Sequence, residues 1–184
     1  MTAPSAFYAD TDEIDQLAIN LFYGWGYNFY RIENQLRTDD LLIRSKVGWL
    51  LASARASVET AESAYRRTFL PPPSRAQPRH DPEAIAGAQA LERLSHAIGA
   101  VEGQIRAQPV PENDRMIERH RQEATTLASL LAIDRRLVGQ AEKLRSAIDG
   151  KDGGWLIEHR AVALDGLAAL AETVRERQAI LFIS

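Results

Sequence analysis

Apolar side chains recur every three or four residues along almost the whole chain. Between Ile14 and Tyr65 this spacing is interrupted once, by a step of seven residues from Leu36 to Ile43. Such spacing places the apolar side chains on one face of an α-helix, in what we call an apolar stripe. No segment alternates apolar and polar residues over several positions, as a half-buried strand would. The sequence therefore predicts an all-α fold.

The first helical region covers residues 11–69, and two models fit it. One long helix would carry Asp39 and Asp40 on its apolar stripe. Two helices would instead meet at residues 37–39, with Thr38 or Asp39 as the N-cap of the second helix. The unbroken phase of the stripe slightly favours one long, kinked helix.

Residues 70–81 form a linker that is rich in proline. Pro71–Pro73 end the first helical region, because proline lacks the amide proton that a helix interior needs. About a dozen residues is long for a connection within a helical bundle. We therefore expect a crossover that spans the bundle, with a mobile loop as the alternative.

Three further helices are expected after the linker. Asp81 and Pro82 have the residue types of an N-cap and a first helical position. Prolines near residue 110 and a glycine-rich turn near residue 150 separate the segments that follow. The predicted ranges are residues 82–107, 112–149 and 154–182.

A helix with one apolar stripe must bury that stripe against another helix. The economical solution is an antiparallel bundle, here of four to five helices, two of them long, with a Pro-rich crossover linker. A chain of 184 residues suffices for one domain with a sizeable core, so residues 1–184 are expected to form a single domain.

The composition excludes several classes of protein. The net charge is −3, so nothing global favours a nucleic-acid partner. Cysteine is absent, which excludes disulfides, thiolate metal sites and cysteine nucleophiles. No apolar run is long enough for a membrane span, and the N-terminus lacks the pattern of a signal peptide. We expect a cytoplasmic protein, and arginine at 19 of the 22 basic positions indicates a GC-rich bacterial genome.

Residues 21–37, which we call the aromatic segment, are the strongest functional signal in the sequence. Six of the thirteen aromatic residues fall between Phe22 and Tyr30, beside several amide and guanidinium groups. Tyr and Trp together with Arg and Asn are typical of a recognition surface. The alternative is a helix wedged between two layers of the core. The predicted binding residues are Tyr23, Trp25, Tyr27, Tyr30, Arg31, Asn34 and Arg37.

Charged residues next to this segment have two interpretations. Glu33–Arg37 and Asp40–Arg44 are spaced by four residues, as in surface ion pairs on a helix. Alternatively, Asp39 or Asp40 points inward and pairs with an arginine of another helix, because a buried acid needs such a partner.

No metal or cofactor site is predicted. His120 and Asp134 both lie on the apolar stripe of one predicted helix, but they are roughly 21 Å apart along its axis. Di-iron bundles need Glu-x-x-His motifs, whereas Glu158 directly precedes His159. Motifs for phosphate loops, serine hydrolases and zinc proteases are also missing.

These observations predict a non-enzymatic protein–protein interaction module, an accessory or assembly subunit of a bacterial cytoplasmic complex, or a self-associating protein. It would bind through the aromatic segment. The alternative is a ligand-binding or enzymatic bundle whose aromatic-lined pocket uses Glu33, Asp40 or His120 and takes a small molecule. The apolar C-terminus, residues 179–184, either folds back onto the bundle or enters a groove of the partner.

Overall fold

The computed structural model describes residues 11–23, 36–75, 79–108 and 123–182. These residues contain six α-helices and no strand, so the predicted all-α fold is confirmed. The helices are α2 (Thr11–Tyr23), α3 (Leu36–Phe69), α4 (Pro82–Arg106), α6 (Glu123–Ile148), α7 (Gly153–Glu158) and α8 (Arg160–Phe182).

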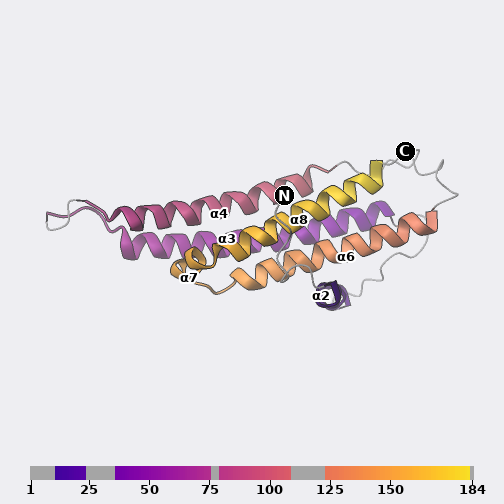
Figure 1. The fold of residues 1–184 in the computed structure, drawn as a ribbon, viewed down its shortest axis with the longest axis horizontal. Helices are drawn as coiled ribbons and strands as arrows, with labels where there is room; N and C mark the ends of the chain where they lie inside the picture. Colours follow the sequence, from indigo (N-terminus) through magenta and orange to yellow (C-terminus); the bar gives the residue numbers. More distant parts are fainter. Residues whose placement is uncertain (1–10, 24–35, 76–78, 109–122, 183–184) are drawn as a thin grey trace.

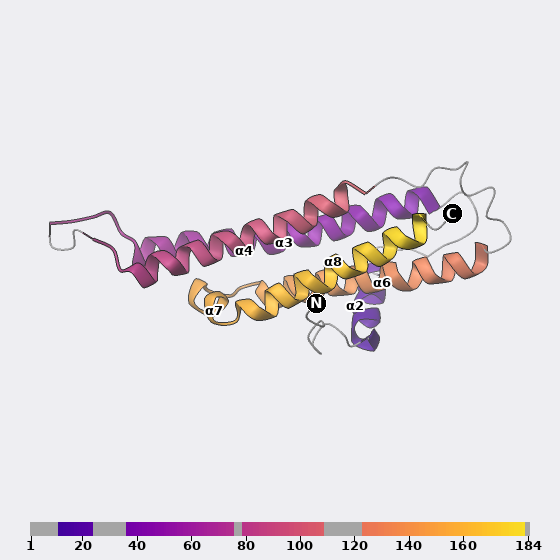
Figure 2. The ribbon, with the colours of Figure 1, turned by 45° about the horizontal axis from the view of Figure 1, so that its top comes forward.

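Four of these helices form two antiparallel hairpins that pack side by side (Figure 1). One hairpin is α3 and α4, and the other is α6 and α8, joined through the short α7. Between the hairpins, α3 packs on α6 and α4 packs on α8, and each of these two pairs runs in the same direction (Figure 2). Helices α4 and α6, although consecutive in the described chain, therefore lie at opposite corners of the bundle.

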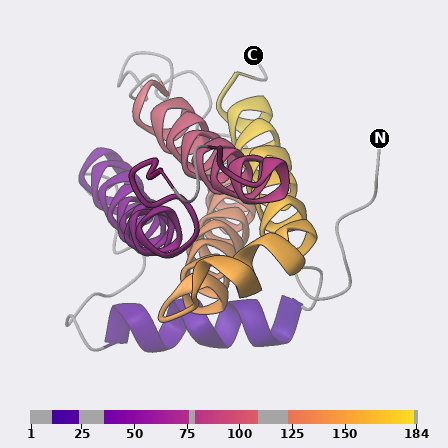
Figure 3. The ribbon, with the colours of Figure 1, turned by 90° about the vertical axis from the view of Figure 1, so that its left-hand side faces the viewer.

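Helix α2 lies across the outside of α6 rather than along the bundle (Figure 3). It ends at Tyr23, and α3 begins at Leu36 in a different direction. The single long helix favoured by the unbroken stripe is therefore wrong. The proposed N-cap is wrong too, because Thr38 and Asp39 lie inside the first turn of α3. Both helices bury one apolar face, although against different neighbours.

The Pro-rich linker joins the adjacent ends of α3 and α4, which pack along their lengths. It does not run the length of the bundle, so the predicted crossover is wrong. Pro71–Pro73 are non-helical and exposed. The start of α4 is as predicted: the Asp81 carboxylate accepts a hydrogen bond of 3.0 Å from the Glu83 amide, and Pro82 follows the cap.

The predicted helix at residues 154–182 is divided at His159. Asp152 caps the short α7 by accepting a bond of 2.9 Å from the Trp155 amide. At the other end, the His159 ring stacks on Trp155 with 4.2 Å between ring centroids, and its Nδ1 lies 3.0 Å from the Trp155 carbonyl oxygen. The Trp155 carbonyl oxygen also accepts the His159 backbone N–H at 2.9 Å, and α8 starts at Arg160.

The apolar stripes meet in one core that all six helices contribute to. The apolar stripe of α3 is buried from Ile43 to Ala61 and Tyr65 is half-buried, whereas the apolar Ile85, near the start of α4, is exposed. The largest fully buried side chains are Ile14, Ile43, Leu50, Leu51, Leu91, Ile98, Ile105, Leu137, Leu144, Ile148 and Leu156.

A buried polar network connects the helices near one end of the core. Asp134 on α6 accepts a hydrogen bond of 2.7 Å from Arg177 on α8, and both side chains are almost fully inaccessible to solvent. Arg177 also donates to the Gln108 side chain at 3.3 Å, just beyond α4. Arg44 on α3 donates to the Gln108 carbonyl oxygen at 2.5 Å. The network therefore links the ends of both hairpins.

Replacing Asp134 should strongly destabilise the protein. Asp134→Ala would leave the buried Arg177 guanidinium without its carboxylate, at a cost of about 3–5 kcal/mol in the free energy of unfolding. Urea unfolding followed by circular dichroism measures this loss. As a control, Glu176→Ala removes the partly exposed Glu176–Arg136 pair of the same two helices and should cost less than about 1 kcal/mol. Equal losses in the two variants would contradict a special role for the buried pair.

Candidate partner-binding surface

The residues predicted to bind a partner lie at the ends of α2 and α3 or between them. Tyr23 is the last residue of α2 and Arg37 is the second residue of α3, and their side chains lie outside the described part of the structure. The same holds for the whole of residues 24–35, which contain Trp25, Tyr27, Tyr30, Arg31 and Asn34. Their predicted role therefore stays a prediction.

The structure also leaves undescribed the residues of the predicted aromatic-lined pocket. Glu33 and His120 lie outside the described residues, as do the side chains of Asp39 and Asp40. The inward-pointing acid that the sequence suggested there stays untested. One inward acid on α6, Asp134, is buried and paired with an arginine of another helix.

The structure does describe how α2, at the N-terminal side of the aromatic segment, is held. Ile14 and Ala18 of α2 are fully buried. At the crossing with α6, a Cβ atom on Gly139 would lie 2.2 Å from the Ile14 carbonyl oxygen, so only glycine allows this approach. Leu21, near the end of α2, packs against the bundle core. The point at which the chain enters residues 24–35 is therefore fixed on the bundle.

On the C-terminal side of the aromatic segment, three of the described side chains in the first half of α3 are large, apolar and exposed. Leu41 is 51% exposed, Leu42 is 42% exposed and Trp49 is 55% exposed, and we call this set the α3 ridge. Leu42 and Trp49 are seven residues apart and so share one face of the helix. Single exposed apolar residues are ordinary, but three within about two turns of α3, close in sequence to the aromatic segment, are a candidate contact surface.

Lys46 contacts Trp49, the largest side chain of the α3 ridge. Its ammonium nitrogen is 4.6 Å from the centre of the Trp49 ring, while the lysine itself is buried. Burial lowers the pKa of Lys46; Glu142 opposes this shift, and Arg145 adds to it. The indole ring thus packs over a cation and is held in an exposed position by a cation–π interaction.

Lys46 of α3 interacts electrostatically with two charged residues of α6, Glu142 and Arg145. Arg145 donates two hydrogen bonds to the Glu142 carboxylate, at 2.6 and 2.8 Å, and Ser146 donates a third at 3.1 Å. The pKa of the Glu142 carboxyl is lowered overall, although burial alone would raise it. The hydrogen bonds and positive charge of Arg145, the hydrogen bond from Ser146 and the charge of Lys46 together outweigh the effect of burial. Glu142 is therefore a structural anion with no proton to exchange near neutral pH.

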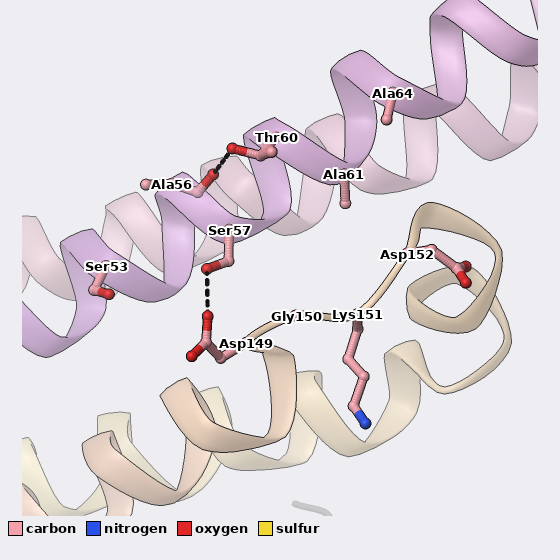
Figure 4. A pocket seen from close by; sticks show the side chains of 10 residues that line it. All are labelled: Ser53, Ala56, Ser57, Thr60, Ala61, Ala64, Asp149, Gly150, Lys151 and Asp152. Atoms are coloured by element: carbon pink, nitrogen blue, oxygen red, sulfur yellow. Dashed lines mark hydrogen bonds between the residues drawn. The ribbon is translucent and has the colours of Figure 1, made fainter.

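A groove of about 580 Å³ lies farther along α3, against the turn between α6 and α7 (Figure 4). Across it, Ser57 donates to Asp149 at 3.3 Å. No aromatic residue and no histidine contributes to the lining, so this groove does not match the predicted aromatic pocket. The lining residues are Ser53, Ala56, Ser57, Thr60, Ala61, Ala64, Asp149, Gly150, Lys151 and Asp152.

Within the described ranges, no group of three or more His, Asp or Glu side chains is arranged to hold a metal ion. In the same ranges, no helix has the length and apolar character needed to cross a membrane.

Sequence reasoning missed three residues of this region: Lys46, Trp49 and Gly139. The sequence could have indicated that Trp49 is exposed, because this large aromatic residue lies next to the stripe position Leu50 and not on the stripe. Lys46 is one of only three lysines. Nothing in the sequence distinguishes Gly139 from the other helical glycines, because its role depends on a helix from a distant part of the chain.

Comparison with known proteins adds no relative: no protein-family model, curated protein or solved structure matches the chain.

Adding a methyl group at Gly139 should release α2 without unfolding the bundle. In Gly139→Ala the new Cβ would collide with the backbone of α2, which cannot move aside as a flexible side chain would. Hydrogen–deuterium exchange should therefore speed up over residues 11–23 and stay unchanged over α4.

Gly103→Ala is the matched control, because a Cβ at this α4 position meets nothing within 4 Å. That variant should gain up to about 1 kcal/mol from helix propensity and keep α2 protected. Identical exchange of residues 11–23 in both variants would show that the close crossing does not hold α2.

Proposed function

We propose that this chain is a non-enzymatic protein–protein interaction module, an accessory or assembly subunit of a bacterial cytoplasmic complex. Its binding surface is the aromatic segment extended by the α3 ridge. The observation that carries this proposal is the exposure of Leu41, Leu42 and Trp49 directly after the segment that holds six of the thirteen aromatic residues.

The energetics of protein interfaces support this assignment. Interfaces concentrate their binding energy in a few residues, and tryptophan, tyrosine and arginine are the most frequent of these. The Trp49 ring is already held by its contact with Lys46. A partner that binds Trp49 therefore loses less free energy to ordering this side chain.

The alternative function, a ligand-binding or enzymatic bundle, requires an aromatic-lined pocket. The groove beside α3 has a volume within the usual range of ligand sites, but small and hydroxyl-bearing side chains line it. Its carboxylates already have roles: Asp149 accepts from Ser57 and Arg145, and Asp152 caps α7. This groove therefore gives the alternative no catalytic or aromatic group.

Replacing Trp49 should weaken partner binding without affecting the fold. Trp49→Ala removes an exposed anchor, so recovery of the partner by the tagged chain from its native host should fall at least tenfold, which corresponds to about 1.4 kcal/mol or more. Quantitative mass spectrometry of the captured proteins measures this, and thermal melting checks the fold.

Phe69→Ala is the control for this experiment. Phe69 is 52% exposed, nearly as much as Trp49, but lies at the opposite end of α3. It should leave partner recovery unchanged. Equal recovery by wild type and both variants would contradict the proposal. A native mass spectrum with extra mass that disappears on denaturation would instead support the ligand-binding alternative.

The aromatic segment itself is tested by single substitutions. Tyr30→Ala and Arg31→Ala should leave the melting temperature almost unchanged and weaken partner binding, because their predicted role is recognition. Trp25→Ala should lower the melting temperature, because Trp25 continues the apolar stripe. If the Tyr30 and Arg31 variants bind the captured partner normally, these residues are not part of the interface.

A further inference from the structure

The connection between α3 and α4 is longer than their hairpin requires. The two helices pack along their lengths, so the ends that the connection joins are adjacent. Packed helices are usually joined by about two to eight residues, whereas this connection covers residues 70–81. Its described parts project beyond the end of the bundle (Figure 2). The extra length is therefore available for contact with another molecule.

The connection begins with three consecutive prolines, Pro71–Pro73, which are exposed, as are Ser74 and Arg75 after them. We call residues 71–75 the proline tract. Proline fixes φ at about −65° and disfavours helical backbone in the residue before it, so a run of three favours the polyproline II conformation. Such a run exposes apolar rings and carbonyl acceptors. Because its backbone is already restricted, a partner orders it at little further cost in entropy.

The same end of the hairpin is basic. Residues 66–80 contain four arginines and no acidic residue, in a chain whose net charge is −3. Arg66 pairs with two glutamates of the hairpin. The other three, Arg67, Arg75 and Arg79, are exposed, and none of them forms an ion pair with another described residue. The exposed prolines therefore lie next to positive charge that the described part of the hairpin does not neutralise.

An aromatic groove with an acidic end is the partner surface that would use both features. Tryptophan and tyrosine side chains pack against proline rings, and their N–H and O–H groups can donate to carbonyl oxygens of the tract. Arg75 follows Pro73 by two residues, roughly 6 Å along a polyproline helix, so a carboxylate at the end of the groove would meet its guanidinium. A nucleic acid or an anionic membrane would bind the arginines but give the exposed prolines no role.

We propose that the proline tract is a docking motif for a protein with an aromatic groove that ends in a carboxylate. The prolines occupy the groove, and Arg75 pairs with the carboxylate. The tract and the α3 ridge lie toward opposite ends of α3, with roughly 30 Å between Trp49 and Pro71 along the helix axis. This inference therefore does not rest on the aromatic segment or the α3 ridge, and it holds or fails independently of them.

Photocrosslinking of the full-length chain in its native host tests this proposal. A benzophenone-bearing amino acid replaces the exposed Ser74 in one chain and the exposed Gln104 of α4 in a control chain. After irradiation, mass spectrometry identifies the crosslinked molecule and the position of the link. The proposal predicts a link from position 74 to a protein, in a region that combines tryptophan or tyrosine with aspartate or glutamate, and none from position 104.

Three variants of the chain crosslinked at position 74 separate the contributions of proline and charge. Pro72→Ala restores backbone freedom and Arg75→Glu reverses a charge, so each should lower the crosslinking yield at least about fivefold. Arg93→Glu makes the same charge change at an exposed position of α4 and should leave the yield unchanged. All three positions are exposed, so thermal melting should match that of the parent chain.

Several results would overturn the proposal. One is a link from position 74 to nucleic acid, to lipid, to a second copy of the chain, or to a protein region without aromatic and acidic residues. Another is a yield at position 74 no higher than at position 104. A yield that Pro72→Ala leaves unchanged, or that Arg93→Glu lowers as much as Arg75→Glu does, would show a general attraction between charges and no docking of the tract.

Discussion

The packing of α6 against three neighbours is the constraint on which the rest of the structure depends. Its apolar stripe lies in the core between α3 and α8, while its opposite face carries α2. The buried Glu142 of α6 bonds chiefly to Arg145 of the same helix. Two other buried charges of α6 pair with different helices: Asp134 pairs with Arg177 of α8, and Lys143 pairs with Glu13 of α2. A buried ion that loses its partner costs several kcal/mol, so these charges fix which neighbour occupies which face.

The two hairpins and the crossing helix together determine where the aromatic segment begins and ends. Helix α2 brings one end of the segment to the outside of α6, and α3 carries the other end along the edge of the bundle. The α3 ridge starts within two turns of that point. The apolar core and the proposed binding surface therefore use opposite faces of the same helix, which allows Trp49 to change with little effect on Leu50.

The sequence predicted the helices and most of the core but only part of the candidate site. Apolar residues at helical spacing, such as Val47, Leu94 and Leu170, are buried, because a period of 3.6 residues identifies the inward face whatever the neighbour is. The aromatic segment was conspicuous from composition alone. Trp49 was overlooked because it lies off the stripe, and Lys46 was overlooked because its burial depends on α6, nearly one hundred residues away in the chain.

Local sequence patterns by themselves determined the helical class, the cap at Asp81 and the identity of the inward faces, since these depend on residues within one or two turns of each other. The tertiary structure alone decided that α2 leaves the direction of α3, that the Pro-rich linker turns between neighbouring helices, and that Asp134 meets Arg177. An apolar stripe specifies that a face must be buried but not which helix buries it. That choice is made by long-range fits such as the notch at Gly139, where Ile14 from a distant part of the sequence can approach.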